Sequence, residues 1–269
     1  MDICVIYSSP KLGDIILQLP FLKAISDKYN KKIIVCINKH ISIKEILEEQ
    51  DYIECVIENA FRKGRFFFHD VLKLSNNLKK KRITKVFIFE KTKGPAIAAK
   101  LSGVQEIYGF GIGSQKYLVD RSIGLEKNDL RYNYSHQSEK FLNKLNIVTR
   151  YDQTFLNLKS NTTDSFFLKY RKFPKPWVCF AVDSTEVNRI WPQKNFAQLA
   201  DKIIGSNLAK TIFVINHENH KNYFQEIIKN SCYKNNFINC KMLNRNQIIH
   251  LINVSTFFVG IDSGPSCVS

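Results

Sequence analysis

The sequence has no pair of cysteines spaced C-x-x-C, and its seven cysteines are an odd number. Both facts argue against a disulfide framework and against a cysteine-bound zinc ion. No run of about 18 apolar residues is free of charge, and no basic segment leads into an apolar stretch and a small-residue cleavage site at the amino terminus. We therefore expect a folded protein in a reducing, cytoplasmic setting.

Acidic residues are also scarce. The chain has 24 Asp and Glu against 40 Lys and Arg, which gives a formal net charge of +16. Such an excess favours an anionic partner, whether nucleic acid, an anionic membrane surface or phosphorylated small molecules, and it does not choose among them. The hydrophobic content of 44% and the charged content of 24% are typical of globular domains, and 269 residues suffice for one large domain or two of ordinary size.

Short apolar runs alternate with longer amphipathic segments along most of the chain. Each apolar run suits a strand buried on both faces, and each following segment has helical spacing, which is typical of βαβ units and a parallel sheet. We expect strands at 2–8, 31–37, 52–57, 85–90, 176–183, 210–216, 236–242 and 256–262, and helices at 14–29, 42–50, 68–81, 94–102, 135–146, 193–204, 219–230 and 246–253.

The alternation of strands and helices stops between the helix at 135–146 and the strand at 176–183, in a stretch rich in Ser, Asn and Thr that ends in FPKP. The pattern thus predicts an α/β protein of two Rossmann-like, doubly wound parallel-sheet domains, at 1–155 and 177–269, joined by a linker at 156–176.

Three loops follow strands at the edge where such sheets bind ligands. The first, SSPKLGDII, carries Asp14; the second, DSTEVNRIW, carries short hydroxyl side chains and Arg189; the third is DSGPS, after the strand at 256–262. Each loop taken alone also fits an ordinary structural role. Asp14 is suited to the positive end of a helix, the second loop to a capped turn, and the third to a β-turn.

Taken together, the three loops resemble glycosyltransferase family 9, the ADP-heptose:lipopolysaccharide heptosyltransferases. The resemblance rests on LGDIILQLPFLKAI, NRIWPQKNFAQLA and VGIDSGPS, in that order. It implies a fold of the GT-B type, with an acceptor-binding first domain and a nucleotide-sugar-binding second domain. It also implies inverting transfer of a heptose or related sugar from an ADP-sugar to a lipopolysaccharide core, without metal or other cofactor. The family pattern carries Pro20 inside its first helix, where a kink is expected.

The resemblance assigns roles residue by residue. Asp14 matches the catalytic base, and the neighbouring Gly13 is assigned to acceptor binding. The basic segment AFRKGRFFF falls where the family contacts its phosphorylated acceptor, which makes Arg62, Lys63 and Arg65 candidates for acceptor binding. The residues that match donor-binding positions are Ser184, Thr185, Arg189, Glu218, Asp262, Ser263 and Gly264.

The chain also departs from the family pattern. Cys267 stands where the family usually has a His, and the chain stops at Ser269 where the family continues, so we expect an incomplete second domain. Two alternatives stay open: a truncated or degenerate homologue that binds nucleotide or anions without efficient transfer, and a basic nucleic-acid-binding protein. On the favoured interpretation the partners are a nucleotide-sugar donor and an anionic glycolipid at the inner membrane surface, with no nucleic acid. The protein would be a monomer, cytoplasmic or peripheral to that membrane.

Overall fold

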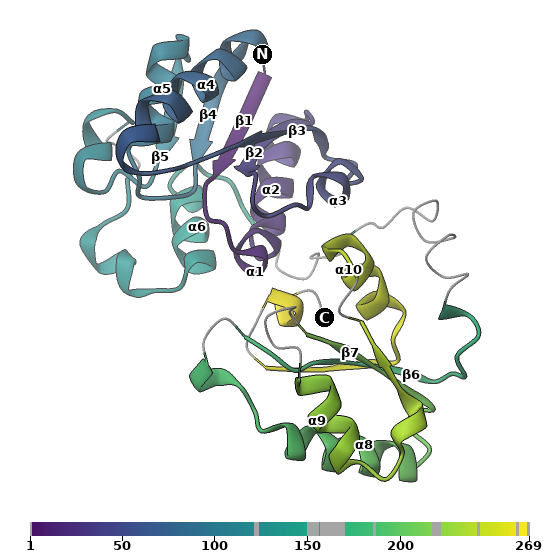
Figure 1. Cartoon of the computed structure of the whole chain (residues 1–269). Helices are drawn as coiled ribbons and strands as arrows, with labels where there is room; N and C mark the ends of the chain where they lie inside the picture. The colour runs from purple at the N-terminus through teal and green to yellow at the C-terminus, as the bar shows by residue number, and fades with distance from the viewer. Residues whose placement is uncertain are drawn as a thin grey trace. The chain divides into compact units, whose positions relative to one another are not determined.

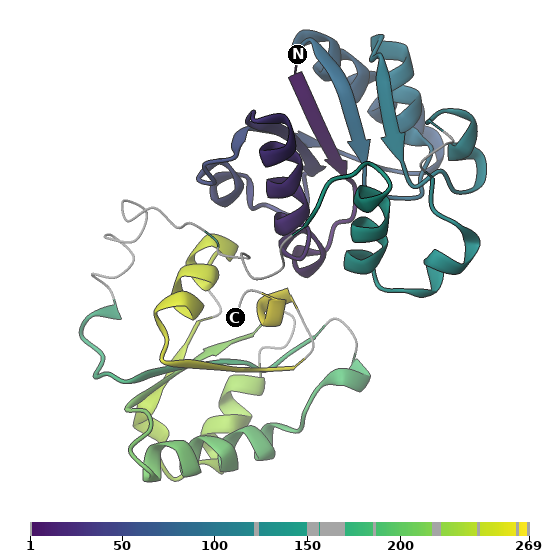
Figure 2. The same cartoon turned by 180° about the vertical axis from the view of Figure 1, so that it is seen from behind.

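The chain forms two compact units, Met1–Asn157 and Leu158–Ser269 (Figures 1 and 2). In this computed structural model the described residues are 2–120, 124–149, 156, 170–184, 187–216, 222–240, 243–261 and 264–267. Within these ranges, every helix is too short or too polar to cross a membrane.

Unit 1 is built on a five-stranded parallel sheet in the order β3-β2-β1-β4-β5. Its strands are β1 (Asp2–Tyr7), β2 (Ile33–Asn38), β3 (Ile53–Asn59), β4 (Ile83–Ile88) and β5 (Glu106–Gly109). The first four match the predicted strands, whereas the short edge strand β5 was not predicted. The central strands β1 and β2 are buried almost throughout, which explains their unbroken apolar runs.

Helices cover both faces of this sheet, as a doubly wound fold requires. On one face, α4 (Phe67–Lys80) and α5 (Gly94–Ser102) lie side by side over a core of β-strand residues (Figure 1). On the other face, α2 (Leu19–Tyr29) and α6 (Tyr134–Asn143) are joined by contacts among aromatic rings. The short helix α3 (Lys44–Glu48) packs against β3.

The single helix predicted at 14–29 is instead two helices. The first, α1, spans Leu12–Ile16, and α2 begins at Leu19 after a break at Leu17 and Gln18. Pro20 therefore lies in the first turn of α2, where its missing N–H would have no helical partner in any case. Pro20 therefore marks the start of a second helix and not the expected kink within one helix.

Unit 2 is a smaller doubly wound unit. Its parallel sheet has the order β8-β7-β6-β9, from β6 (Trp177–Ala181), β7 (Thr211–Ile215), β8 (Phe237–Asn239) and β9 (Phe257–Gly260). Helices α8 (Gln193–Gly205) and α9 (Tyr223–Asn230) cover one face, and α10 (Arg245–Val254) packs on the other. The two sheets confirm the predicted fold class.

The described end of the predicted linker packs into unit 2. Tyr170 is buried, and its ring lies 5.5 Å from that of Phe213 on β7. Phe173 lies 6.0 Å from the same ring and accepts a hydrogen bond from the Trp177 indole through its carbonyl. The predicted limits of the domains and linker stay a prediction.

Candidate active site

Each sheet reverses its strand order at one point. In unit 1 the chain builds outward from β1 to β2 and β3, then places β4 on the other side of β1. In unit 2 the first strand, β6, lies between β7 and β9. Ligands of doubly wound folds bind beyond the carboxyl ends of the strands at such a switch point. All three loops singled out in the sequence leave strands that flank these two points.

Asp14 lies in the first turn of α1, directly beyond β1. Its side chain is half-buried, and one of its carboxylate oxygens accepts a 2.9 Å hydrogen bond from the Ser9 hydroxyl. The Ser9 oxygen in turn accepts from the Lys11 amide at 3.3 Å. Asp14 makes no cap: the helix is preceded by Lys11, which has no capping side-chain bond. The loop therefore holds a carboxylate in place at the switch point.

A second carboxyl group, Glu90, lies at the same switch point and was not identified from the sequence. It follows β4, is only 7% exposed, and accepts hydrogen bonds from the hydroxyls of Ser8, beyond β1, and Thr92. Burial raises the pKa of Glu90 to about 7, although the bonds from Ser8 and Thr92 act in the opposite direction. The sequence did contain a signal for Glu90: it ends the apolar run KVFIFE, and an acid at the end of a buried strand lies at the sheet edge where ligands bind.

Tyr7 adds a buried hydroxyl to this group. Its side chain is 1% exposed, and burial, followed by the nearby Asp14 carboxylate, raises the pKa of the phenol well above its ordinary value. The phenol thus stays protonated over the physiological range. The switch point of unit 1 collects Asp14, Glu90, Ser8, Ser9 and Tyr7 from the ends of two neighbouring strands.

The loop that carries Glu90 is fixed by Gln115, which is fully buried. Its side-chain amide donates to the carbonyls of Glu90 at 2.9 Å and Thr92 at 2.8 Å, while its oxygen accepts from the Gly111 amide at 2.8 Å. These bonds tie the loop after β4 to the loop after β5. The position of Glu90 is consequently set by the fold.

In unit 2, Arg189 lines a pocket at the switch point. The pocket has a volume of about 440 Å³ and lies between the loop after β6 and the end of β9. Its lining residues are Asn188, Arg189, Ile190, Trp191, Phe196, Val259, Gly260 and Ile261. Trp191 packs edge-on against Phe196, with ring centroids 4.9 Å apart. A guanidinium beside an apolar wall suits a ligand with an anionic and a flat apolar part.

The pocket wall at the end of β9 leaves no free space for a side chain at Gly260. A Cβ atom added at Gly260 would clash with the ring of Phe258 and come within 3.0 Å of the Ser266 hydroxyl. That hydroxyl donates a 2.5 Å hydrogen bond to the carbonyl of Ile261. The chain then turns through a short 3-10 helix, Gly264–Cys267, which carries the predicted Gly264 and the half-buried Cys267.

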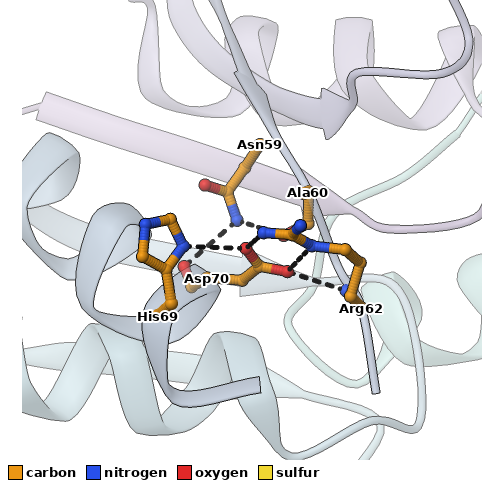
Figure 3. A network of polar contacts seen from close by, with 5 residues as sticks. All are labelled: Asn59, Ala60, Arg62, His69 and Asp70. Atoms are coloured by element: carbon orange, nitrogen blue, oxygen red, sulfur yellow. Dashed lines mark hydrogen bonds and ion pairs between the residues drawn. The ribbon is translucent and has the colours of Figure 1, made fainter. Parts of the chain in front are cut away.

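The basic segment before α4 is ordered by one ion pair (Figure 3). The Arg62 guanidinium donates two hydrogen bonds to the Asp70 carboxylate, at 2.9 and 2.6 Å, and its backbone amide donates a third at 3.0 Å. Asn59 donates to the carbonyls of Ala60 and Asp70. The Phe66 ring contacts two cations: its centroid lies 4.3 Å from the Arg62 guanidinium and 4.8 Å from that of Arg65. Arg62 therefore serves first to hold this loop, with Lys63 and Arg65 exposed beside it.

The structure thus brings together some of the predicted site residues. Gly13 and Asp14 lie at the switch point of unit 1, and the half-buried Ser184 and the exposed Arg189 lie on the loop after β6 of unit 2. Four predicted residues lie outside the described residues: Thr185, Glu218, Asp262 and Ser263. In the described ranges, no group of three or more His, Cys, Asp or Glu side chains is placed to hold a metal ion.

Comparisons with solved structures define the class first. The chain is similar to a family 9 glycosyltransferase from Veillonella parvula, with 16% identity over 99% of this chain and 76% of that one and a TM-score of 0.79. It is also similar to E. coli ADP-heptose lps heptosyltransferase II, with 16% identity over 98% and 80% of the chains and a TM-score of 0.75. A third similar structure is the E. coli heptosyltransferase WaaC with ADP, with 15% identity over 100% of this chain and 83% of that one and a TM-score of 0.73. The fold is that of GT-B glycosyltransferases.

The family follows from the sequence itself. The family profile described as glycosyltransferase family 9 (heptosyltransferase) matches residues 113–269, which is more than half of the chain. A comparison with curated proteins finds no match. This chain belongs to glycosyltransferase family 9 and is a glycosyltransferase, which confirms the resemblance stated from the three loops.

Proposed function

We propose that this protein transfers a heptose, or a related sugar, from an ADP-sugar to a lipopolysaccharide or lipooligosaccharide core acceptor, with inversion and without a metal ion. The observation that supports the proposal most directly is Asp14, a carboxylate fixed by Ser9 at the switch point of unit 1. Its place beyond β1 suits a general base that takes the proton of the acceptor hydroxyl as that oxygen attacks the anomeric carbon. A single direct displacement inverts that carbon.

Unit 2 is proposed to bind the donor. As the glycosidic bond breaks, negative charge develops on the leaving ADP, and a guanidinium can stabilise it with two parallel hydrogen bonds. Arg189 lines the pocket beside β9 and Ser184 lies on the same loop, which supports this assignment. Thr185, Glu218, Asp262, Ser263 and Gly264 are proposed as further donor contacts on the basis of the family pattern. Because cationic side chains supply the charge, we expect excess EDTA to leave turnover unchanged.

The acceptor is proposed to bind unit 1. Lys63 and Arg65 are exposed cations on the loop after β3, the same sheet edge that carries Gly13 and Asp14. Arg62, anchored by Asp70, is proposed to add a phosphate contact through its exposed side. We propose that the enzyme works at the cytoplasmic face of the membrane that holds this glycolipid.

The base is tested by transfer from ADP-heptose to a lipopolysaccharide core acceptor. We expect Asp14→Asn to lower kcat by about 10²–10⁴-fold, the usual contribution of general base catalysis. The matched control is Asp27→Asn, which changes an exposed carboxylate of α2 that forms an ion pair with Lys23, one turn earlier. Turnover that survives Asp14→Asn would refute the base assignment.

Donor binding is tested separately by calorimetry with ADP. We expect Arg189→Ala to weaken ADP binding by about tenfold, as expected for a lost charge-assisted hydrogen bond. Arg171→Ala, an exposed arginine of the same unit, is the control. Binding of ADP without any transfer would favour the degenerate homologue over the active enzyme.

A further inference from the structure

The outward face of α4 carries large apolar side chains that the core does not use. Phe68 is 72% exposed and Leu72, one turn later, is 54% exposed, and Phe66 just before the helix is 40% exposed. The apolar residues on the opposite side of the helix, Val71, Leu74 and Leu78, are buried against the sheet. Residues four apart lie on one helix face, so Phe68 and Leu72 form a continuous apolar strip.

Positively charged side chains lie along one side of this strip and at its two ends. Arg65, Lys73, Lys79 and Lys80 are all exposed, and together with Phe66, Phe68 and Leu72 we name them the α4 surface. The segment 61–82 contains eight Lys and Arg and a single carboxylate, Asp70. Asp70 is buried and bound by Arg62, which also holds the pKa of that carboxyl well below its usual range. The α4 surface therefore presents no acidic side chain.

This combination of exposed groups is specific. A basic segment alone is usually a solvated helix face, and single exposed apolar residues are common. An exposed Phe and Leu on one face, with Lys73 along one side and Lys or Arg at each end, is instead the pattern of helices that lie in the boundary between lipid headgroups and acyl chains. Each cation near an anionic leaflet adds to the attraction.

The surface lies beside the candidate acceptor site. Helix α4 follows β3, so its first turn is at the carboxyl edge of the sheet, the edge where β1 presents Asp14. The start of α4 also packs against the start of α5: a Cβ added at Gly94 would lie 3.2 Å from the ring of Phe67. A bilayer against this face would hold a membrane-anchored acceptor near that edge.

We propose that the α4 surface docks on an anionic phospholipid bilayer, with Phe68 and Leu72 inserted at the headgroup boundary and the neighbouring cations on lipid phosphates. This inference rests on the proposed function, because it assigns the surface from which the lipid-linked acceptor is reached.

The test is co-sedimentation with vesicles of mixed phosphatidylcholine and phosphatidylglycerol, compared with pure phosphatidylcholine. We expect the wild-type chain to bind the mixed vesicles and to lose binding as salt rises. The double variant Phe68→Ser with Leu72→Ser should weaken binding by at least about tenfold, because two large apolar side chains no longer insert. The matched control, Leu101→Ser with Tyr117→Ser, removes side chains that are 59% and 65% exposed elsewhere in unit 1 and should bind like the wild type.

A second measurement separates this proposal from the proposed transfer reaction. With a water-soluble, delipidated acceptor, the Phe68/Leu72 double variant should turn over at the wild-type rate, whereas Asp14→Asn should lose turnover and keep vesicle binding. Equal vesicle binding by the Phe68/Leu72 variant and the wild type would overturn the docking surface while leaving the transfer reaction intact. The docking surface would also be overturned if analytical ultracentrifugation showed a dimer of the wild-type chain that the Phe68/Leu72 double variant dissociates.

Discussion

Glu90 gives a sharp test of the switch point in unit 1, because its environment favours the neutral carboxyl. The group is 7% exposed and has a pKa of about 7 against an ordinary value of 4.5. Glu90→Gln keeps the shape and an oxygen that can accept the bonds from Ser8 and Thr92. The substitution thus removes the ionisation and preserves the packing.

The sign of the effect follows from proton binding. Between pH 4.5 and about 7 the folded state binds a proton at Glu90 that the unfolded state has released, so stability falls as pH rises through this window and is level above it. One pKa unit corresponds to about 1.4 kcal/mol, so the difference between 4.5 and about 7 gives a total loss of roughly 3.5 kcal/mol. We expect the stability of E90Q relative to the wild type to increase by about 2–3 kcal/mol between pH 5 and pH 8.

The assay is amide hydrogen exchange in β4, measured for both chains from pH 5 to 8. Other titrating groups cancel in the difference between the two chains. Both tryptophans, Trp177 and Trp191, lie in unit 2, so tryptophan fluorescence follows that unit and is expected to be unchanged by the substitution. A difference in stability between the chains that does not vary with pH would refute the argument that Glu90 is held neutral.

Three further predictions concern single contacts. Ser9→Ala should lower kcat by about tenfold with little change in KM, because it removes the 2.9 Å hydrogen bond that orients Asp14, and Ser9→Thr should restore most of the rate. Gly260→Ala should destabilise unit 2 by about 1–3 kcal/mol through its clash with Phe258, seen as a lower urea midpoint by tryptophan fluorescence. Asp70→Asn should lower stability at pH 7, because it weakens the bonds between this side chain and Arg62. The pKa of the native carboxyl lies below its ordinary 3.8, so the stability from these bonds is lost as pH falls from 3.8 through the lowered pKa, and the two chains should then be about equally stable. Acid titration of both chains by circular dichroism checks this.

Most of the secondary structure could be predicted from the sequence, because both sheets are parallel and covered on both faces. Several of their strands, such as β2 and β6, are nearly unbroken apolar runs, which are easily recognised in the sequence. Strand β5 could not be predicted in this way: it is four residues long, at an edge, and alternates partly and fully buried positions. The break between α1 and α2 was missed because the residues on either side are apolar and helical in spacing.

The site was predicted less completely than the fold. The strand order at the switch points was not fixed by local sequence, so nothing local showed that β4 would lie beside β1 and bring Glu90 next to Ser8. For the same reason the pairing of Arg62 with Asp70, eight residues later, was not predicted, although both residues were visible in the sequence. Short motifs give the residue types at a sheet edge, whereas tertiary contacts decide which of them meet.

The late return of α6 to the start of the chain has a consequence for synthesis on the ribosome. Phe141 packs edge-on against Phe89 and Phe110, and the buried Ser138 hydroxyl donates to the buried Gln18 side chain at 2.7 Å, 120 residues apart in the chain. A nascent chain that ends before α6 leaves two aromatic rings uncovered and a buried amide without this bond. We therefore expect unit 1 to complete its core only after residue 143 has left the exit tunnel, and to expose part of its apolar surface until then.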